Sequence, residues 1–196
     1  MSPRPSVEAE RREEVLAATW ALITERGADR VRIADIAERV GSSTGTIHYY
    51  FETRQGVLDA AFRFAVADSR RRSEEALAGH TDPWSRLVAL LEAHMPRGEV
   101  RKEWLIWLQL WSEASVRPEL RPLNEENYRS WIDLVAAIVR DGQQAGQFKS
   151  VDARAFATQL LTMMDGLVIQ VTMDSAEVDL ARLRELLLGF ARGQLL

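Results

Sequence analysis

Cysteine is missing from this 196-residue sequence, which excludes disulfides, thiolate metal sites and cysteine nucleophiles. The sequence also lacks any uncharged apolar run of about 18 residues, so we expect no membrane span. Its beginning, MSPRPSVEAERREE, lacks the apolar stretch of a signal peptide. These absences predict a protein of the reducing cytoplasm.

Motifs for catalysis are also absent. The three histidines, His48, His80 and His94, are too widely separated to match a metal-ligand spacing. The sequence contains no G-x-x-x-x-G-K-[ST], G-x-G-x-x-G or G-x-S-x-G motif. We therefore expect no catalytic residue, no metal and no cofactor, and an enzyme is disfavoured.

The composition is that of a globular protein, with 46% hydrophobic and 28% charged residues. The net charge of −4 counts against a nucleic-acid partner, and residues 1–54, with eight Arg and nine Asp plus Glu (8 − 9 = −1), do not reverse it. Charge placement matters more, because a surface can be locally positive on an acidic protein. Within 39–54 the only acid is Glu52, against Arg39 and Arg54.

Apolar residues recur at helical spacing throughout, and no segment alternates in the manner of a strand. The sequence therefore predicts an all-α protein of about nine helices. Glycine, proline and capping residues place these at about 6–26, 33–40, 44–50, 54–78, 83–94, 100–115, 123–145, 153–172 and 177–192. Short helices give way to long ones near residue 54, which predicts an N-terminal domain at 1–54 and a helical body at 55–196.

The most informative segment is VRIADIAERVGSSTGTIHYYFETR, from Val31 to Arg54. It predicts two short helices joined by a turn that contains Gly41, which is a helix-turn-helix. Ile47 and Phe51, four residues apart, form the buried stripe of the second helix. Its other face carries hydroxyls, an imidazole and phenol rings, groups that can contact base edges and phosphates.

This segment resembles the head of the TetR family of transcriptional regulators. The residues in register are Gly27, Ile36, Ala37, Gly41, Ser43, Gly45, Thr46, Ile47, Tyr50 and Phe51. Three departures are His48 in place of the usual tyrosine, Arg54 in place of lysine and Arg32 in place of threonine. The body is similar only in helix number, in length and in Asp165-Gly166-Leu167, which resembles the betaine-pathway repressor branch of the family.

The resemblance implies a homodimer that binds a pseudo-palindromic operator in double-stranded DNA and releases it when a small effector binds the body. The DNA contacts that it implies are Arg32, Ile33, Ser43, Thr44, Gly45, Thr46, His48, Tyr49, Tyr50 and Arg54. Tyr49 and Tyr50 could instead cover the core of the head.

The body contains an aromatic stripe that could be plain core or the wall of an effector pocket. Trp104, Trp107 and Trp111 share one helix face at spacings of three and seven. The predicted pocket comprises Met95, Trp104, Trp107, Trp111, Glu113, Trp131, Met163, Met164 and Asp165. A carboxylate among tryptophans could bind a cation through its charge and through cation–π contact. Alternatively, Glu113 and Asp165 are solvated or pair with Arg117 or Arg154.

The last two helices are apolar on more than one face, and each such face must be buried. One face can belong to the core of the protomer and the other to a four-helix dimer interface. The predicted interface residues are Phe156, Leu160, Leu167, Leu183, Leu187 and Phe190.

Two other interpretations stay open at this point. The head could bind protein, so that the chain is a helical interaction module without DNA binding. The regulator could also activate rather than repress, because the sign depends on where the operator lies relative to the promoter.

Overall fold

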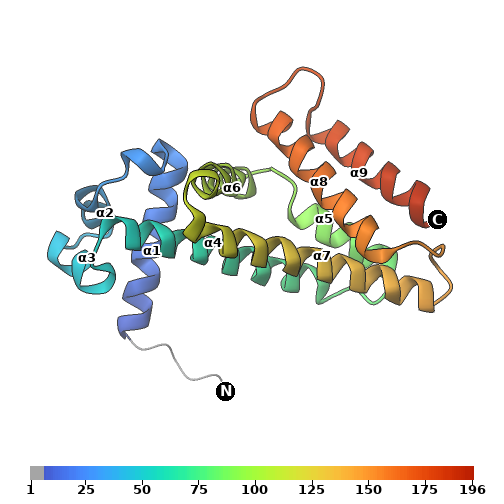
Figure 1. Ribbon diagram of the computed structural model, residues 1–196, viewed down its shortest axis with the longest axis horizontal. Helices are drawn as coiled ribbons and strands as arrows, with labels where there is room; N and C mark the ends of the chain where they lie inside the picture. Colours follow the sequence, from blue (N-terminus) through green and yellow to red (C-terminus); the bar gives the residue numbers. More distant parts are fainter. Residues whose placement is uncertain (1–6) are drawn as a thin grey trace. The chain divides into compact units, whose positions relative to one another are not determined.

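Residues 7–196, the part of the chain that the structure describes, form nine α-helices and no strand in this computed structural model (Figure 1). The helices are α1 (Val7–Arg26), α2 (Ile33–Arg39), α3 (Thr44–Phe51), α4 (Arg54–Leu77), α5 (Pro83–Ala93), α6 (Glu99–Val116), α7 (Arg121–Gln144), α8 (Ala153–Thr172) and α9 (Leu180–Leu195). The all-α prediction is confirmed. The predicted start of the first helix at Ser6 lies outside the described residues.

Local sequence signals set most helix ends. Gly27 ends α1 with a φ of 82°, a conformation that glycine adopts without steric strain. Thr53 and Asp152 cap α4 and α8 by accepting hydrogen bonds from the amides of Gly56 and Ala155, each at 3.0 Å. The last helix begins at Leu180 rather than at 177, because the side chain of Asp179 caps it.

The chain forms two compact units. The first runs to Asp68 and includes Leu105–Leu120, whereas the second comprises Ser69–Trp104 and Arg121–Leu196. Both α4 and α6 therefore contribute residues to each unit. This division differs from the predicted boundary at residue 54, because the first turns of α4 carry side chains such as Val57 that are fully buried.

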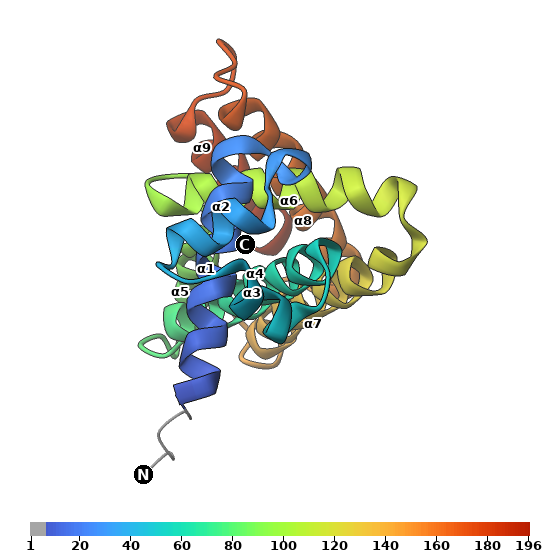
Figure 2. The same cartoon turned by 90° about the vertical axis from the view of Figure 1, so that its left-hand side faces the viewer.

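The first unit has its core among α1, α2, α3 and the first part of α4. Figure 2 shows α1 passing beside α2 and α3, which are in contact with each other. Ile36 of α2 and Ile47 of α3 have no exposed surface, as their stripe in the sequence predicts. Burial of these apolar faces fixes the orientation of α3 and leaves its opposite side to solvent.

The second unit is a helical bundle in which α7 packs on α8 and α5, and α8 packs on α9 (Figure 1). Phe156 of α8 and Phe190 of α9 stack with their ring centroids 5.6 Å apart. Gly142 of α7 is buried under Phe148, and a β-carbon built on it would lie 2.2 Å from the Phe148 ring. The position therefore has no room for a side chain.

Candidate functional sites

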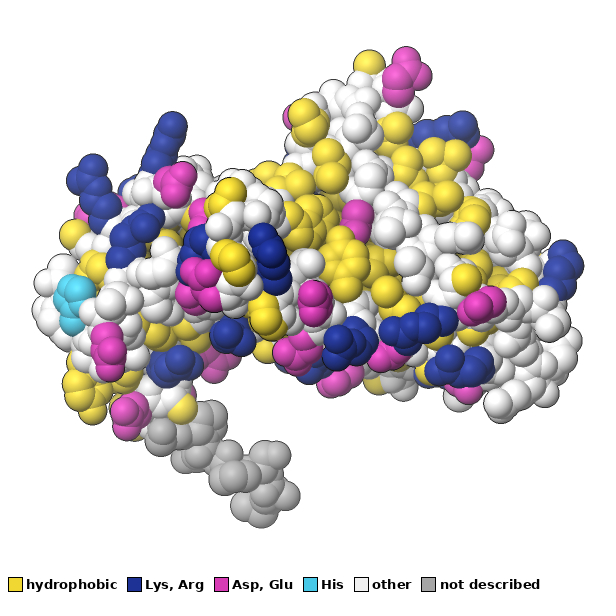
Figure 3. All heavy atoms as spheres, in the orientation of Figure 1, with side chains coloured by type: hydrophobic (Ala, Val, Ile, Leu, Met, Phe, Trp, Pro, Cys, Tyr) yellow, Lys and Arg dark blue, Asp and Glu magenta, His cyan; other side chains and the backbone are white. Residues whose placement is uncertain are grey.

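The outer face of α3 is the candidate DNA-binding face. Tyr49 is 74% exposed, and Thr44, Gly45 and His48 are also exposed, whereas Tyr50 is half-buried. Figure 3 shows a histidine among uncharged polar groups over α3. The predicted orientation of this polar face, away from the core of the head, is what the structure shows.

The hydroxyl groups at the start of α3 also have a structural task. The side chain of Ser43 accepts a hydrogen bond from the Thr46 amide at 3.1 Å, so Ser43 is the N-cap of the helix. Its hydroxyl lies 3.1 Å from that of Thr46. The two side chains thus fix each other at the N-terminal end, the part of a recognition helix that approaches the bases.

The flanking positions of the predicted set lie at the start of α2. Arg32 is exposed, and its amide donates to the Asp35 carboxylate at 2.9 Å, which caps the helix. Ile33 is half-exposed beside it. Both are therefore accessible to a partner of the head.

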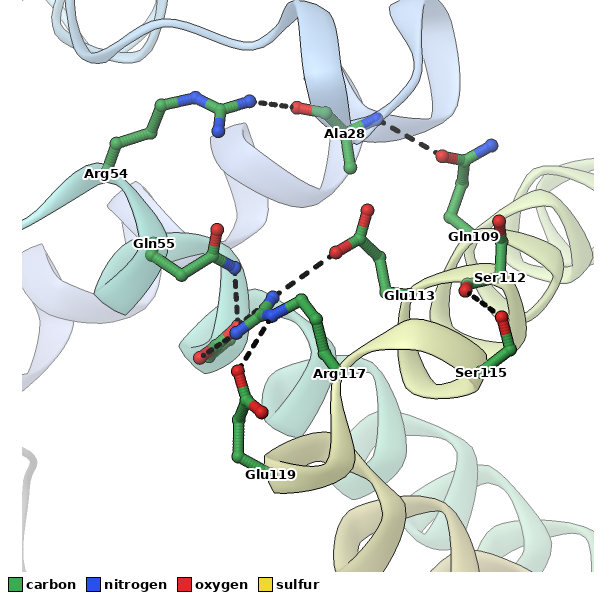
Figure 4. Close-up of polar contacts among 10 residues, drawn as sticks. Ala28, Arg54, Gln55, Gln109, Ser112, Glu113, Ser115, Arg117 and Glu119 are labelled. Carbon is green, nitrogen blue, oxygen red and sulfur yellow. Dashed lines mark hydrogen bonds and ion pairs between the residues drawn. The ribbon is translucent and has the colours of Figure 1, made fainter.

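Arg54, which is predicted to contact a phosphate, makes two hydrogen bonds to the backbone of the head. Its Nε donates to the Val31 carbonyl at 2.6 Å, and a terminal nitrogen donates to the Ala28 carbonyl at 2.5 Å (Figure 4). The Ala28 carbonyl also accepts from the Val31 amide at 3.3 Å, so the guanidinium is its second donor. Arg54 thereby ties the start of α4 to the segment before α2, and in this conformation its charge points into the head.

The backbone of Ala28 is also bound by Gln109, which belongs to the α6 segment of the first unit. The Ala28 amide donates to Gln109 Oε1 at 3.3 Å (Figure 4). Directly after the end of α6, Arg117 donates to Asp59 of α4 at 3.1 and 3.2 Å and to Glu113 at 3.3 Å. Hydrogen bonding to these carboxylates, Asp59 foremost, raises the pKa of Arg117. Sequence reasoning had indicated the Glu113–Arg117 pairing as an alternative but not the links to the head.

The residues of the predicted effector pocket are divided between the two units. Trp107, Trp111 and Glu113 belong to the first unit, while the other six residues belong to the second. Glu113 pairs with Arg117, which it shares with Asp59 and Glu119.

Asp165 is the acidic group in the second unit that best fits a cation-binding role. It is partly buried on α8, and Tyr128 of α7 donates to its carboxylate at 2.5 Å. Burial raises the pKa of Asp165 to about 6, and the hydrogen bond from Tyr128 opposes that rise. Among the described residues no cationic side chain pairs with it, and Arg154 pairs with Asp133 instead. Asp165 is therefore a carboxylate whose charge no cationic side chain among residues 7–196 compensates.

Two further polar atoms lie along the same helix faces. The Oδ1 atom of Asn124, four residues before Tyr128 on α7, is buried and has no hydrogen-bond partner among the described residues. The hydroxyl of Thr172, seven residues after Asp165 on α8, is likewise buried without a hydrogen-bond partner among the described residues. Because residues four and seven apart share a helix face, both belong to the side of the Asp165–Tyr128 pair. Sequence periodicity offered no signal for this grouping, since it depends on how α7 packs on α8.

Of the remaining predicted pocket residues in the second unit, Trp104 and Trp131 both lie beside His94, whose ring centroid is 6.3 Å from that of Trp131. Trp131 lines a cavity of about 280 Å³ between α4 and α7, together with Ser69 and Ser73. Trp104 is 7% exposed and donates to the His94 carbonyl at 2.9 Å, while Met164 is 1% exposed. Met95 lines a separate cavity, and Met163 is half-exposed. Burial of His94, whose carbonyl accepts from Trp104, lowers the pKa of its imidazole.

The predicted dimer interface is wrong for four of its six residues. Phe156, Leu160, Leu183 and Leu187 are at most 3% exposed within a single chain, so they form the core of the protomer. The half-exposed apolar residues on the other faces of α8 and α9 are Met163, Leu167, Leu186 and Phe190. Figure 3 shows hydrophobic side chains at the surface over these two helices. Leu161, Met164 and Val168 of α8 are also at most 7% exposed, so the core of the protomer takes more than one face of that helix.

Two family descriptions match the chain. "Bacterial regulatory proteins, tetR family" matches residues 15–61, and "BetI-type transcriptional repressor, C-terminal" matches residues 83–196, more than half of the chain. The chain belongs to the TetR family. It is thus a helix-turn-helix transcriptional regulator with a BetI-type C-terminal domain.

Individual relatives agree with this placement. The transcriptional regulator BetI of Paraburkholderia xenovorans is 30% identical over 186 residues, which cover 90% of this chain and 89% of that protein. BetI of Serratia proteamaculans is 29% identical over 92% of this chain and 90% of its own length.

No helix among residues 7–196 has the length and apolarity that a bilayer crossing requires.

Solved structures are similar over nearly the whole chain. A regulator from Saccharomonospora viridis in complex with choline is 36% identical with a TM-score of 0.89, covering 95% of this chain and 97% of that one. A TetR regulator from Haloarcula marismortui is 26% identical with a TM-score of 0.86, covering 95% and 99%.

Proposed function

We propose that this TetR-family regulator is a repressor that binds a pseudo-palindromic operator as a homodimer in the cytoplasm and leaves it when a small organic cation binds the second unit. The observation that carries the effector class is Asp165, a partly buried carboxylate with no cationic partner in the described part of the chain.

A quaternary ammonium ion such as choline suits this position. An uncompensated carboxylate in a partly desolvated site favours a cation, and the ring of Tyr128 beside it can add a cation–π contact. The hydroxyl of choline could donate to the unpartnered Asn124 Oδ1. The choline complex of the Saccharomonospora viridis regulator supports the same class of ligand.

Two continuous helices offer a route from the effector to the DNA-binding face. Both α4 and α6 contribute to each unit, and in the first unit they hold Ala28 through Arg54 and Gln109. An effector needs only to favour one arrangement of these helices over another, and a coupling of about 1–3 kcal/mol is typical of allosteric proteins.

The second copy of the chain would cover the half-exposed face of α8 and α9. This face combines the apolar side chains of Leu167 and Leu186 with Gly166 and Gly189, where an added β-carbon would meet nothing within 4 Å. Bare glycines let helices of two subunits approach closely, so the face suits a four-helix interface.

The proposal is tested by operator binding with and without choline. The purified protein should protect a palindromic site near its own gene, and choline should release it at concentrations that raise the melting temperature. Thr46→Ala and Tyr49→Ala should weaken operator binding while the protein stays dimeric, whereas Trp131→Ala tests the α4–α7 cavity. If Trp131→Ala abolishes the choline response and Asp165→Asn does not, the effector site is that cavity and the assignment to Asp165 is wrong.

A further inference from the structure

His48 stands on the exposed side of α3 with one ring nitrogen already engaged. Its Nδ1 lies 2.8 Å from the backbone carbonyl oxygen of Glu52. Because a carbonyl oxygen can only accept, the proton of this hydrogen bond belongs to Nδ1. In the neutral imidazole the other nitrogen, Nε2, is then an acceptor without a proton.

The end of α3 is built so that this hydrogen bond forms. Glu52 ends the helix with a φ of 54°, and its amide donates to the His48 carbonyl at 2.9 Å. The Glu52 carbonyl, which lies past the last helical residue, has no donor from the helix and accepts from the imidazole instead. Two hydrogen bonds thus join His48 to Glu52, and they fix both the tautomer and the direction of the ring.

The surroundings of His48 place it where a base can be reached. Thr44, one turn earlier on the same face, is exposed, and an added β-carbon on Gly45 would meet only the Ser43 hydroxyl at 3.5 Å. The helix backbone can therefore approach a DNA groove closely at this end. In the neutral ring Nε2 only accepts, so it cannot bond a phosphate oxygen, which is also an acceptor.

We propose that His48 reads an exocyclic amino group in the major groove, either N6 of adenine or N4 of cytosine, through an unprotonated Nε2. These amino groups are the donors that the major-groove edges present. The inference rests on the DNA-binding role of α3 and adds to it a specific base-edge group. A tyrosine at this position would present a hydroxyl, which both donates and accepts, so this histidine narrows the set of bases that fit.

The experiment uses operators in which one position of both half-sites carries a base without its amino group. Purine replaces adenine and 2-pyrimidinone replaces cytosine, so the two arms distinguish the two sources of the amino group. At one position the wild-type protein should lose about 5- to 30-fold in affinity per altered half-site. His48→Phe, which keeps a ring but removes the acceptor, should bind both forms of that operator equally.

Three results would overturn the proposal. His48→Phe could lose as much affinity as the wild type when the amino group is removed, or no position could respond in the wild type. His48→Phe could also lose the same affinity for every operator, with binding that weakens less steeply with salt, by about the amount of one phosphate contact. That result would assign the ring to the DNA backbone instead. Thr46→Ala and Tyr49→Ala keep the failures separate, because unchanged binding by both would reject the whole α3 face rather than His48 alone. Melting and sedimentation of His48→Phe verify its fold.

Discussion

Replacing Asp165 by asparagine should stabilise the ligand-free protein at neutral pH while it weakens choline binding. In the folded state burial raises the pKa of Asp165 from 3.8 to about 6, which corresponds to about 3 kcal/mol as an upper value. Asp165 is only partly buried, so we expect about 2 kcal/mol. Asparagine removes this cost, because its amide oxygen still accepts from Tyr128 and carries no charge.

The same shift fixes the pH dependence of stability. The folded state keeps the proton of Asp165 up to about pH 6, whereas the unfolded chain releases it near pH 4. The folded state therefore binds more protons between these values, and the contribution of Asp165 to stability falls as the pH rises through this interval. Above pH 6 the contribution of Asp165 to stability stays at its lowered value. The Asp165→Asn protein should lack the decline in stability between about pH 4 and pH 6 that this residue causes.

Urea unfolding and thermal melting at pH 5 and pH 7.5 measure the difference. At pH 7.5 a gain of about 2 kcal/mol corresponds to a melting temperature roughly 4–8 °C higher for a chain of this size. Calorimetry at pH 7.5 should show choline affinity reduced at least about tenfold. Asp133→Asn, an exposed carboxylate paired with Arg154, is the control and should change neither quantity by a comparable amount. An Asp165→Asn protein that is less stable at pH 7.5, or that keeps the wild-type pH profile and choline affinity, would refute the reasoning.

Three other substitutions test the packing and the assembly. Gly142→Ala should lower the free energy of unfolding by about 1–3 kcal/mol in urea titrations, because its methyl group would overlap the Phe148 ring; an unchanged midpoint would contradict the packing. Arg117→Gln should cost about 1–3 kcal/mol, because Asp59 and its neighbouring carboxylates lose their common cation; the same unfolding assay measures it, and no loss would show that the network is not stabilising. Leu186→Asp should yield monomers in sedimentation experiments, since it places a charge on the proposed dimer face; a dimer of unchanged strength would move the interface elsewhere.

Local signals in the sequence were sufficient for the helices and for the head. Gly27, Thr53 and Asp152 end or begin helices through backbone and capping chemistry that involves only near neighbours. The buried stripe of Ile47 and Phe51 likewise determined which side of α3 faces outward. Such features are readable because helical periodicity is a property of consecutive residues.

Only the tertiary structure decided which polar groups are free to bind and which are already engaged. The charge of Arg54 is used by Val31 and Ala28, 23 and 26 residues away, and Asp165 has Tyr128 as its partner from 37 residues away. Which apolar residues of α8 and α9 stay half-exposed was equally beyond the sequence, since they have the same hydrophobic character as the buried ones. Hydrogen bonds and packing between distant segments depend on three-dimensional distance, which no periodic pattern in one segment encodes.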